Sequence, residues 1–466
     1  MPSRSVRVLL ALAGAVLAAA VVVDLVVYRS GGSRPATTSQ PQPQPQPPAQ
    51  PFAVTATASG ATGLSETITW TTPEPSTGTL RWGPAGAAPV LWTRSPAEAA
   101  SHTVTLSGLV PATGYQVEID AVADDGATAT GTLPFTTPPA PAADSSAVRG
   151  GALLVNGAPF FPLIAWEQCP DQWEPNIAQG IDLFAGNPCT GLPSLLAALQ
   201  GRALAVGTSD DQVAQGAGLI GWFYPDEADG RGLTAATLPA PPPGGVRFLT
   251  LSNHFFSLAA PLPDGRGIYP GLIARADVVG FDLYPLQEWC RPDLLGDVFD
   301  AQRQLVALAG GKPTFQWIEV REMQCPQVPV TQDDIRAESW LAIAGGAQGL
   351  GFFPADWGAQ VGATIRGIAT RIRQLTPALV RPVLAVAAGP AGSPVRASAR
   401  DLHGALYVIA VNPSSARARV TLVQPLAGDR TFDVLGRAEQ VTAVNGAISD
   451  VLPPLGVRVY VAPPPG

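Results

Sequence analysis

The stretch that decides the fold is residues 219–227, which read Leu-Ile-Gly-Trp-Phe-Tyr-Pro-Asp-Glu. Its first six residues are apolar, aromatic or small, a proline stops the run, and two carboxylates follow. A short apolar run bounded by a turn residue is typical of a buried strand in a parallel sheet. The acidic pair would then lie at the carboxyl end of that strand.

Seven further apolar runs flank this one, separated by helix-length stretches. The eight candidate strands cover residues 160–166, 181–185, 203–206, 219–224, 247–251, 278–284, 314–320 and 349–353. Eight βα units in about 230 residues match the usual size of a (β/α)8 or TIM barrel, whose active groups sit at the carboxyl ends of the strands. We therefore predict a barrel over residues 145–382. The alternative is a doubly wound sheet, which would need a glycine-rich loop after the first strand, where the chain reads Trp166-Glu167-Gln168.

The placing of two glutamates resembles a family. Glu227 follows predicted strand four, and Glu319 ends predicted strand seven. This pattern resembles the large clan of retaining glycoside hydrolases built on this barrel, the clan A type. The resemblance implies that Glu227 is the acid/base and Glu319 the nucleophile. That chemistry needs two carboxyl groups about 5–5.5 Å apart, one protonated and one ionised.

Other side chains at predicted strand ends suit a sugar site, in which aromatic and polar groups mix. They are Trp166, Glu167, Asn253, His254, Tyr284, Trp289 and Trp357. By the resemblance, Tyr284 would hydrogen-bond the nucleophile and Trp357 would be a platform for a sugar ring. Asp226 departs from the family, which has asparagine there to contact the sugar's 2-hydroxyl; aspartate accepts that hydrogen bond but cannot donate one. Asp182 and Asp282 lie inside strand patterns and are predicted to be structural.

No metal or cofactor is predicted, because cleavage by two carboxyl groups needs neither. The sequence also lacks the HExxH, GxSxG, P-loop and CxxC motifs of other enzyme classes. A strand-end glutamate also fits helix capping or an ion pair. The leading hypothesis is therefore a glycosidase, and the alternative is a non-catalytic surface protein whose barrel binds glycan or scaffolds other partners.

The four cysteines all fall in predicted loops of the barrel. An even number of cysteines in an exported protein indicates disulfides. Cys169 and Cys189 follow neighbouring strands, as do Cys290 and Cys325, so we predict the pairs 169–189 and 290–325. A zinc site is the alternative, but these spacings differ from those of known zinc clusters.

The N-terminus carries an export signal. Arg4 and Arg7 precede an apolar run over residues 8–23, which residues 25–28 extend beyond Asp24. A run of about 20 residues is long enough to span a bilayer, which favours an uncleaved membrane anchor over 1–29 rather than a cleaved signal. Residues 30–51 are rich in Pro and Gln and are predicted to be a semi-rigid spacer. We therefore expect extracytoplasmic domains, anchored to the membrane or secreted.

Residues 52–138 alternate short strands with turns, the pattern of an all-β sandwich. Strands are expected at residues 53–57, 66–71, 80–82, 102–106 and 115–122. With Trp70 in an early strand and residues 109–115 as the turn into a tyrosine corner, this part resembles a fibronectin type III domain. Such modules usually act as spacers or binding surfaces, so adhesion through this module is a third hypothesis.

The alternation returns over residues 383–464, where a C-terminal β-sandwich is predicted. Strands are expected at residues 395–399, 405–411, 417–423, 431–434 and 457–461. This part resembles the small sandwich that often follows glycoside-hydrolase barrels. The complete prediction is a multidomain chain in which one β-sandwich precedes the barrel and another follows it.

Charge restricts the partners. Charged residues make up 14% of the chain, the net charge is −8, and Lys312 is the only lysine. No basic run interleaved with aromatic residues is present, so a nucleic-acid partner is not expected. A mildly acidic surface suits a neutral glycan better than a polyanion.

Overall fold

The computed structural model describes residues 51–61, 65–110, 112–138, 145–199, 202–209, 211, 216–354 and 356–465. The predicted membrane anchor and nearly all of the predicted spacer lie outside the described residues. Within the described ranges, no helix is both long and apolar enough to cross a membrane.

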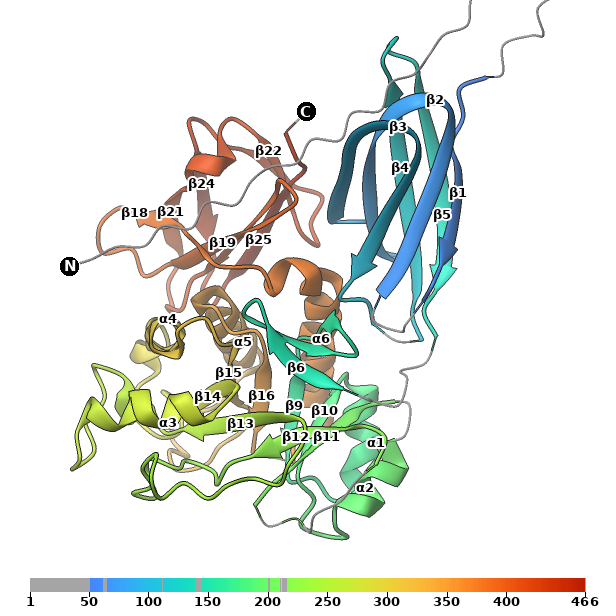
Figure 1. Ribbon diagram of the computed structural model, residues 1–466. Helices are drawn as coiled ribbons and strands as arrows, with labels where there is room; N and C mark the ends of the chain where they lie inside the picture. The colour runs from blue at the N-terminus through green and yellow to red at the C-terminus, as the bar shows by residue number, and fades with distance from the viewer. Residues whose placement is uncertain are drawn as a thin grey trace, which may run out of the picture. The chain divides into compact units, whose positions relative to one another are not determined.

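The predicted eight-stranded parallel barrel is confirmed (Figure 1). Its strands are β9 (Leu163–Trp166), β10 (Leu183–Ala185), β11 (Leu204–Gly207), β12 (Leu219–Phe223), β13 (Val246–Leu251), β14 (Val278–Asp282), β15 (Thr314–Glu319) and β16 (Leu350–Phe353). Each strand pairs in parallel with the next one along the chain, and β16 pairs back to β9. The carboxyl ends of all eight strands therefore meet at one end of the barrel.

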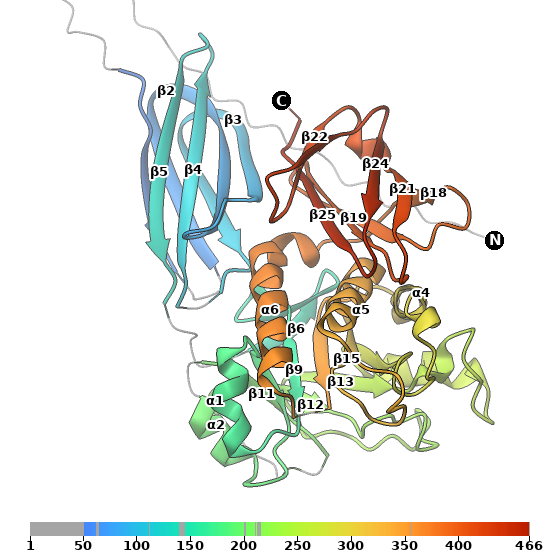
Figure 2. The same ribbon diagram turned by 180° about the vertical axis from the view of Figure 1, so that it is seen from behind.

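The helices of the barrel are α1 (Pro170–Ala178), α2 (Leu192–Leu199), α3 (Tyr269–Arg275), α4 (Asp297–Ala309), α5 (Gln332–Gly345) and α6 (Ala359–Leu379). Three short 3-10 helices join them: η1 (Asn253–Phe255), η2 (Arg266–Ile268) and η3 (Pro292–Leu294). Helices α4, α5 and α6 lie side by side outside the last strands (Figure 2). The expected helix after β12 is absent, because the fully described residues 224–245 form turns; the five prolines and four glycines there disfavour a helix.

Aromatic side chains fill the barrel interior. Phe223, Phe248, Phe315 and Trp317 form one buried cluster with aliphatic side chains of the other strands. A Cβ atom at Gly351 would lie 2.0 Å from the Trp317 ring, so this position on the neighbouring strand admits only glycine while the indole stays where it is. The barrel thus positions a large indole near the carboxyl end of β15.

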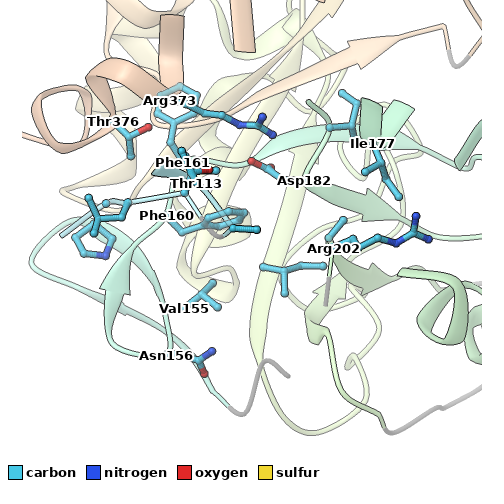
Figure 3. Close-up of a pocket in the computed structure, with 18 residues that line it drawn as sticks. Thr113, Val155, Asn156, Phe160, Phe161, Ile177, Asp182, Arg202, Arg373 and Thr376 are labelled. Carbon is cyan, nitrogen blue, oxygen red and sulfur yellow. The ribbon is translucent and has the colours of Figure 1, made fainter. Parts of the chain in front are cut away.

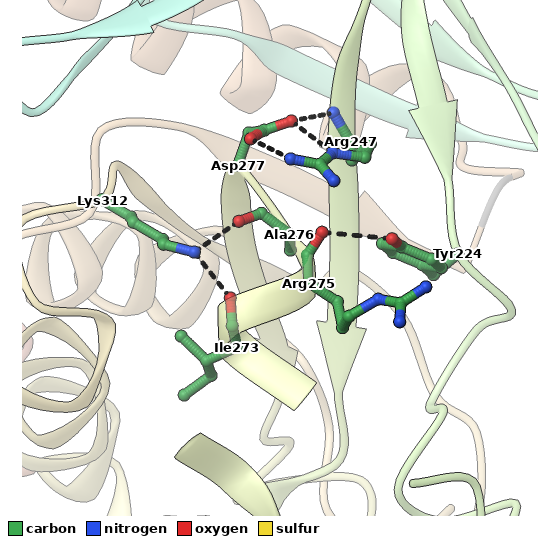
Figure 4. A network of polar contacts seen from close by, with 7 residues as sticks. All are labelled: Tyr224, Arg247, Ile273, Arg275, Ala276, Asp277 and Lys312. Atoms are coloured by element: carbon green, nitrogen blue, oxygen red, sulfur yellow. Dashed lines mark hydrogen bonds and ion pairs between the residues drawn. The ribbon is translucent and has the colours of Figure 1, made fainter. Parts of the chain in front are cut away.

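The amino ends of β13 and β14 are held by a polar network (Figure 4). The Arg247 guanidinium makes two hydrogen bonds to the Asp277 carboxylate, at 2.8 and 2.7 Å. The ammonium of Lys312 donates to the carbonyl oxygens of Ile273 and Ala276 where α3 ends, at 2.7 and 2.6 Å. The Tyr224 hydroxyl donates to the Arg275 carbonyl at 3.1 Å. The only lysine is therefore structural, and the stretch 219–227 is tied at its middle to α3.

Before the barrel the chain forms two antiparallel sheets. The first contains β1 (Thr55–Ser59), β2 (Ser65–Pro84), β3 (Leu91–Ser107), β4 (Gly114–Ala123) and β5 (Thr128–Thr136). The first part of β2 pairs with β1 and its last part pairs with β4, so this one long strand connects β1 to β4 within the sheet. The Tyr115 hydroxyl on β4 accepts a hydrogen bond from the Val110 backbone N–H at 2.8 Å. A smaller sheet of β6 (Ser146–Arg149), β7 (Ala152–Val155) and β8 (Ala158–Pro159) leads into β9.

After the barrel the chain forms two further sheets. They contain β17 (Leu384–Ala385), β18 (Ala387–Gly389), β19 (Arg396–Leu402), β20 (Ala405–Val411), β21 (Ala418–Val423), β22 (Thr431–Val434), β23 (Gln440–Thr442), β24 (Ala447–Leu452) and β25 (Val457–Ala462), with η4 (Pro425–Ala427) between β21 and β22. One sheet has the order β17-β19-β20-β25-β22-β23 and the other β18-β21-β24, and both supply side chains to one apolar core. The buried Arg400 donates to the Ile343 carbonyl of α5 at 2.8 Å, which joins these sheets to the barrel.

Candidate active site

A cavity of about 310 Å³ lies at the carboxyl ends of the barrel strands. Its lining combines carboxyl groups, aromatic rings and amides. The lining residues are Trp166, Asp226, Glu227, Asp282, Tyr284, Gln287, Glu288, Trp317, Met323, Gln324 and Phe353. Of the residues predicted to form the site, the structure thus brings together Glu227, Asp226, Tyr284 and Trp166.

The acidic pair that follows β12 is held by a buried carboxylate two residues later. Asp229 accepts hydrogen bonds from the backbone N–H and the hydroxyl of Ser252, at 2.8 and 2.6 Å, and from the Tyr269 hydroxyl at 2.9 Å. Glu227 has a φ of +44°, a left-handed conformation that is uncommon for a residue with a side chain. The turn is thereby fixed, with Glu227 exposed and Asp226 half-buried.

The pKa values of both carboxyls in this pair are raised. Burial raises the pKa of Asp226, while the nearby Arg231 lowers it. Burial also raises the pKa of Glu227, and the negative charges of Asp226, Asp229 and Glu288 add to that effect. Like charges in one site disfavour simultaneous ionisation.

Asp282, which the sequence predicts to be structural, ends β14 and lines the cavity. Its side chain is 8% exposed, and its Oδ1 atom accepts a hydrogen bond of 2.5 Å from the Tyr284 hydroxyl. Burial raises the pKa of Asp282 well above the ordinary value, and the charges of Asp226 and Glu227 raise it further, whereas the Tyr284 hydrogen bond lowers it. Of the carboxyls in the cavity, Asp282 is the one most strongly driven to keep its proton.

Two residues predicted to bind the ligand, Asn253 and His254, lie outside the cavity lining and hold neighbouring groups in place. The Asn253 amide donates to both carboxylate oxygens of Glu288, each at 2.9 Å, and so orients that side chain. The His254 Nδ1 atom donates to the Ala260 carbonyl at 2.7 Å and fixes its own loop. Neither side chain lines the cavity.

Glu319, the predicted nucleophile, does not reach the cavity lining. Its side chain is 0% exposed, and its two carboxylate oxygens accept hydrogen bonds from the backbone N–H groups of Leu286 and Gln287, at 3.0 and 2.8 Å. Burial raises the pKa of Glu319 to about 8, although both backbone hydrogen bonds lower it. The neighbouring Glu338 is also buried, and its Oε1 accepts from the Glu319 backbone N–H at 3.3 Å. In this structure Glu319 anchors the loop after β14 instead of facing the site.

Trp357, the predicted sugar platform, also lies outside the lining. Its indole N–H donates to the Gln179 side-chain oxygen at 2.5 Å, and its ring packs against Phe352. The walls are made by other rings: Trp166 meets Trp317 edge-on at 5.7 Å between centroids, and the Tyr284 ring stacks on another aromatic, Phe353, at 6.0 Å.

The two predicted cysteine pairs, Cys169 with Cys189 and Cys290 with Cys325, are those that lie at disulfide distance, with Cα atoms 5.5 Å apart in each. The second pair joins the loops after β14 and β15, which both line the cavity. Gln287 joins the same loops, because its side chain donates to the Val328 carbonyl at 2.6 Å and accepts from the Met323 N–H at 2.6 Å. The wall bearing Glu288 and Gln324 is therefore held both by a cysteine pair and by the hydrogen bonds of Gln287.

A different cavity, of about 320 Å³, lies near the amino ends of the strands and is mainly apolar (Figure 3). Phe160, Phe161 and Ile177 line it beside the carboxyl group of Asp182, which precedes β10. Asp182 accepts a hydrogen bond from the Leu163 backbone N–H at 2.7 Å, and burial raises its pKa to about 7. Since this group anchors the start of β9, we take it as structural.

No metal is suggested by the donor atoms: among the described residues, no group of three or more His, Cys, Asp or Glu side chains could hold one. The lining of the cavity at the carboxyl ends also contains no Lys, Arg or His. What the site can supply is therefore carboxyl chemistry between aromatic walls.

Comparisons with known proteins give structural likenesses only. No protein-family model matches the sequence, and no curated protein matches it. The structure is similar to β-D-glucuronidase of Dictyoglomus thermophilum, with a TM-score of 0.33 and 9% identity over 69% of this chain and 68% of that one. It is also similar to the β-glucuronidase of Ruminococcus gnavus, with a TM-score of 0.34 and 9% identity over 69% and 68% of the chains. A GH30 endoxylanase of Clostridium papyrosolvens gives a TM-score of 0.39 and 11% identity over 65% and 96%. At such values the function has to be inferred from the site itself.

Proposed function

We propose that this protein is an extracytoplasmic glycoside hydrolase whose catalytic carboxyl pair is Glu227 and Asp282. The observation that carries the proposal is the cavity at the strand ends, where both carboxyls lie between aromatic walls and have raised pKa values. Glycosidic cleavage needs one protonated and one ionised carboxyl group in the same site.

Burial decides which of the two keeps the proton. Asp282 is nearly fully buried and its pKa is raised well above the ordinary value, whereas Glu227 is more accessible, so we assign the proton to Asp282 and the charge to Glu227. Asp282 is thus the acid, and Glu227 is the nucleophile that attacks the anomeric carbon. This assignment replaces Glu319, whose two oxygens are bound to backbone N–H groups outside the cavity.

The proposal includes retention of configuration. Asp282 gives its proton to the glycosidic oxygen as the bond to the anomeric carbon breaks, and a Glu227 oxygen bonds to that carbon. Water then gives a proton back to Asp282 and its oxygen to the anomeric carbon, which releases Glu227.

The finer domain assignments belong to the same proposal. The Tyr115 hydroxyl bonded to the backbone five residues upstream supports a fibronectin type III domain over 52–138. The shared core of the last two sheets supports a C-terminal β-sandwich over 383–464.

The two cysteine pairs support an oxidising compartment outside the cytoplasm, with the N-terminal segment as membrane anchor. The carboxyl-lined cavity disfavours a polyanion and accepts the predicted neutral glycan.

Substrates with different leaving groups distinguish the acid, Asp282, from the nucleophile, Glu227. We use aryl glycosides whose leaving groups differ in pKa. D282N should lose little rate on the substrate whose leaving group has the lowest pKa, because that group departs without an acid. It should lose at least roughly 100-fold on the substrate whose leaving group has the highest pKa. E227Q should lose roughly 1,000-fold or more on all of them, because removing the nucleophile blocks the first step. Proton NMR of the first product anomer tests retention. Asp264→Asn and Glu439→Gln, at exposed positions outside the cavity, are the matched controls.

The wild-type pH profile should be bell-shaped. Activity rises as Glu227 ionises and falls as Asp282 loses its proton, and both limbs lie above the ordinary carboxyl range because both pKa values are raised. A chain that binds sugars but cleaves no glycoside would contradict catalysis and establish the alternative, a glycan-binding barrel.

A further inference from the structure

The ionisable side chains that line the cavity include carboxyl groups but no basic group. Asp226, Glu227, Asp282 and Glu288 line it, and none of the lining residues is basic. Arg231 lowers the pKa of Asp226 and Glu227 from a distance, but it is exposed and does not line the cavity. Only two of the four carboxyls are used in the proposed reaction.

We propose that the sugar bound in this cavity carries a free ammonium group, so that the substrate is an amino-sugar glycan. This inference rests on the proposed hydrolase activity and replaces the predicted neutral glycan by one that carries a positive charge. The ammonium group would be held by Asp226 and Glu288, the two lining carboxylates outside the catalytic pair.

Hydrogen-bond chemistry favours this ligand over a neutral one. An ionised carboxylate only accepts hydrogen bonds, and an ammonium group only donates them. Glu288 is already oriented, because the Asn253 amide holds both of its oxygens and leaves their remaining lone pairs for a ligand. A uronic acid would bring a further negative charge into a cavity that has no cation in its lining.

The most buried carboxyl does not compete for the ammonium group. Asp282 is 8% exposed and lines the cavity, and its Oδ1 accepts a hydrogen bond from the Tyr284 hydroxyl. As the protonated acid of the proposed reaction it is uncharged, so Asp226 and Glu288 are the carboxylates that the ammonium group meets.

The aromatic walls add to the attraction. The rings of Trp166, Trp317, Tyr284 and Phe353 line the same cavity. A cation close to an aromatic face is attracted by the ring quadrupole, most strongly for tryptophan, and the same rings stack on a sugar. Binding of a cation would also relieve the repulsion among the carboxyls.

The test compares sugars that differ in one substituent. For both the gluco and the galacto ring, dissociation constants of the full chain are measured at pH 7 by tryptophan fluorescence and by ligand-observed NMR. The set contains the 2-amino sugar, its N-acetyl derivative, the neutral sugar and the uronic acid. We expect the amino sugar to bind roughly tenfold more tightly than the neutral sugar, as for a charge-assisted hydrogen bond, and the uronic acid most weakly.

A double variant tests the holding residues. D226N/E288Q should bring the ratio of neutral to amino-sugar dissociation constants close to one. Asp264→Asn, the same charge change at an exposed position, should keep the ratio. Calcium is titrated alone as the control for a general cation site.

Three results would overturn the inference: a neutral or uronic sugar bound as tightly as the amino sugar, an unchanged ratio in D226N/E288Q, or calcium binding tighter than any sugar. If neutral glycosides are cleaved and the ratio is near one, the inference fails and the hydrolase stands. If no sugar binds and no glycoside is cleaved, both fail.

Discussion

The phenolic hydroxyl of Tyr284 donates a hydrogen bond of 2.5 Å to Oδ1 of Asp282. This bond favours the ionised form of a carboxyl group that burial drives toward the neutral form. Two opposed effects therefore set the pH at which the proposed acid loses its proton.

Replacing Tyr284 by phenylalanine should move the basic limb of the activity profile upward. A hydrogen bond to a charged group contributes about 1.5–3 kcal/mol, and 1.36 kcal/mol corresponds to one pKa unit, so the expected shift is about 1–2 units. The sign follows because the lost bond had lowered the Asp282 pKa. The pH dependence of kcat/KM measures it; a basic limb that stays in place or moves down would show that Asp282 is not the acid.

Glu319→Gln should act on stability. The amide nitrogen would face one of the two backbone N–H groups of Leu286 and Gln287 that the carboxylate now accepts, which leaves a buried donor unpaired. We expect a loss of about 1–3 kcal/mol in the free energy of unfolding, measured by chemical denaturation.

Glu439→Gln, the same change at an exposed position, is the control for that variant. Its stability should stay near that of the wild type. An E319Q protein of unchanged stability with at least a 1,000-fold lower rate would restore Glu319 as nucleophile.

Asp182→Asn should stabilise the protein at high pH. Burial raises the pKa of Asp182 from 3.8 to about 7, so the folded state holds this proton more tightly than the unfolded state. The wild type therefore loses stability as the pH rises from about 4 through 7, whereas the amide still accepts the Leu163 N–H and does not titrate. Melting temperatures of the two should agree at pH 4 and favour D182N at pH 8. Equal curves at both pH values would contradict the raised pKa.

Loss of the disulfide between Cys290 and Cys325 should weaken both the fold and the site. The two cysteines are 35 residues apart, and a link over such a loop contributes about 2–4 kcal/mol. The serine pair C290S/C325S should also bind sugar less tightly, because its loops carry Glu288 and Gln324. C169S/C189S, which opens a 20-residue loop, should lose less of both. Calorimetry and sugar titration measure the two effects.

Much of the barrel could be predicted from the sequence, because each strand is a short apolar run with a clear stop. Each predicted strand overlaps an observed one, although the strand predicted to end at Tyr284 ends at Asp282. That difference of two residues moves Asp282 from inside the predicted strand to the carboxyl end of β14, where the active groups of such barrels lie. Tyr284 lines the cavity as predicted, but its hydroxyl bonds Asp282 and not the predicted nucleophile Glu319.

The remaining site residues depend on loop paths and side-chain directions that one sequence does not contain. Glu319 does end β15, but the loop after β14 covers it with two backbone N–H groups. Trp357 follows β16 and donates to Gln179, whereas Trp317, within β15, belongs to the buried aromatic cluster and also lines the cavity. Glu288 belongs to a loop whose course is fixed by Cys290 and Gln287, which no local pattern reveals.

The pairing of β16 with β9 has a consequence for how the protein is made. The first strand of the barrel acquires its second neighbour only when the last one is available, with Leu350 beside Leu163. Contacts between such distant parts of a chain form slowly. A nascent chain that ends before β16 exposes unpaired edges on both β9 and β15, which favours aggregation. The cysteines that follow β9 and β10 can meet during that interval, so oxidation of the first pair can precede ring closure and hold the open edge in register.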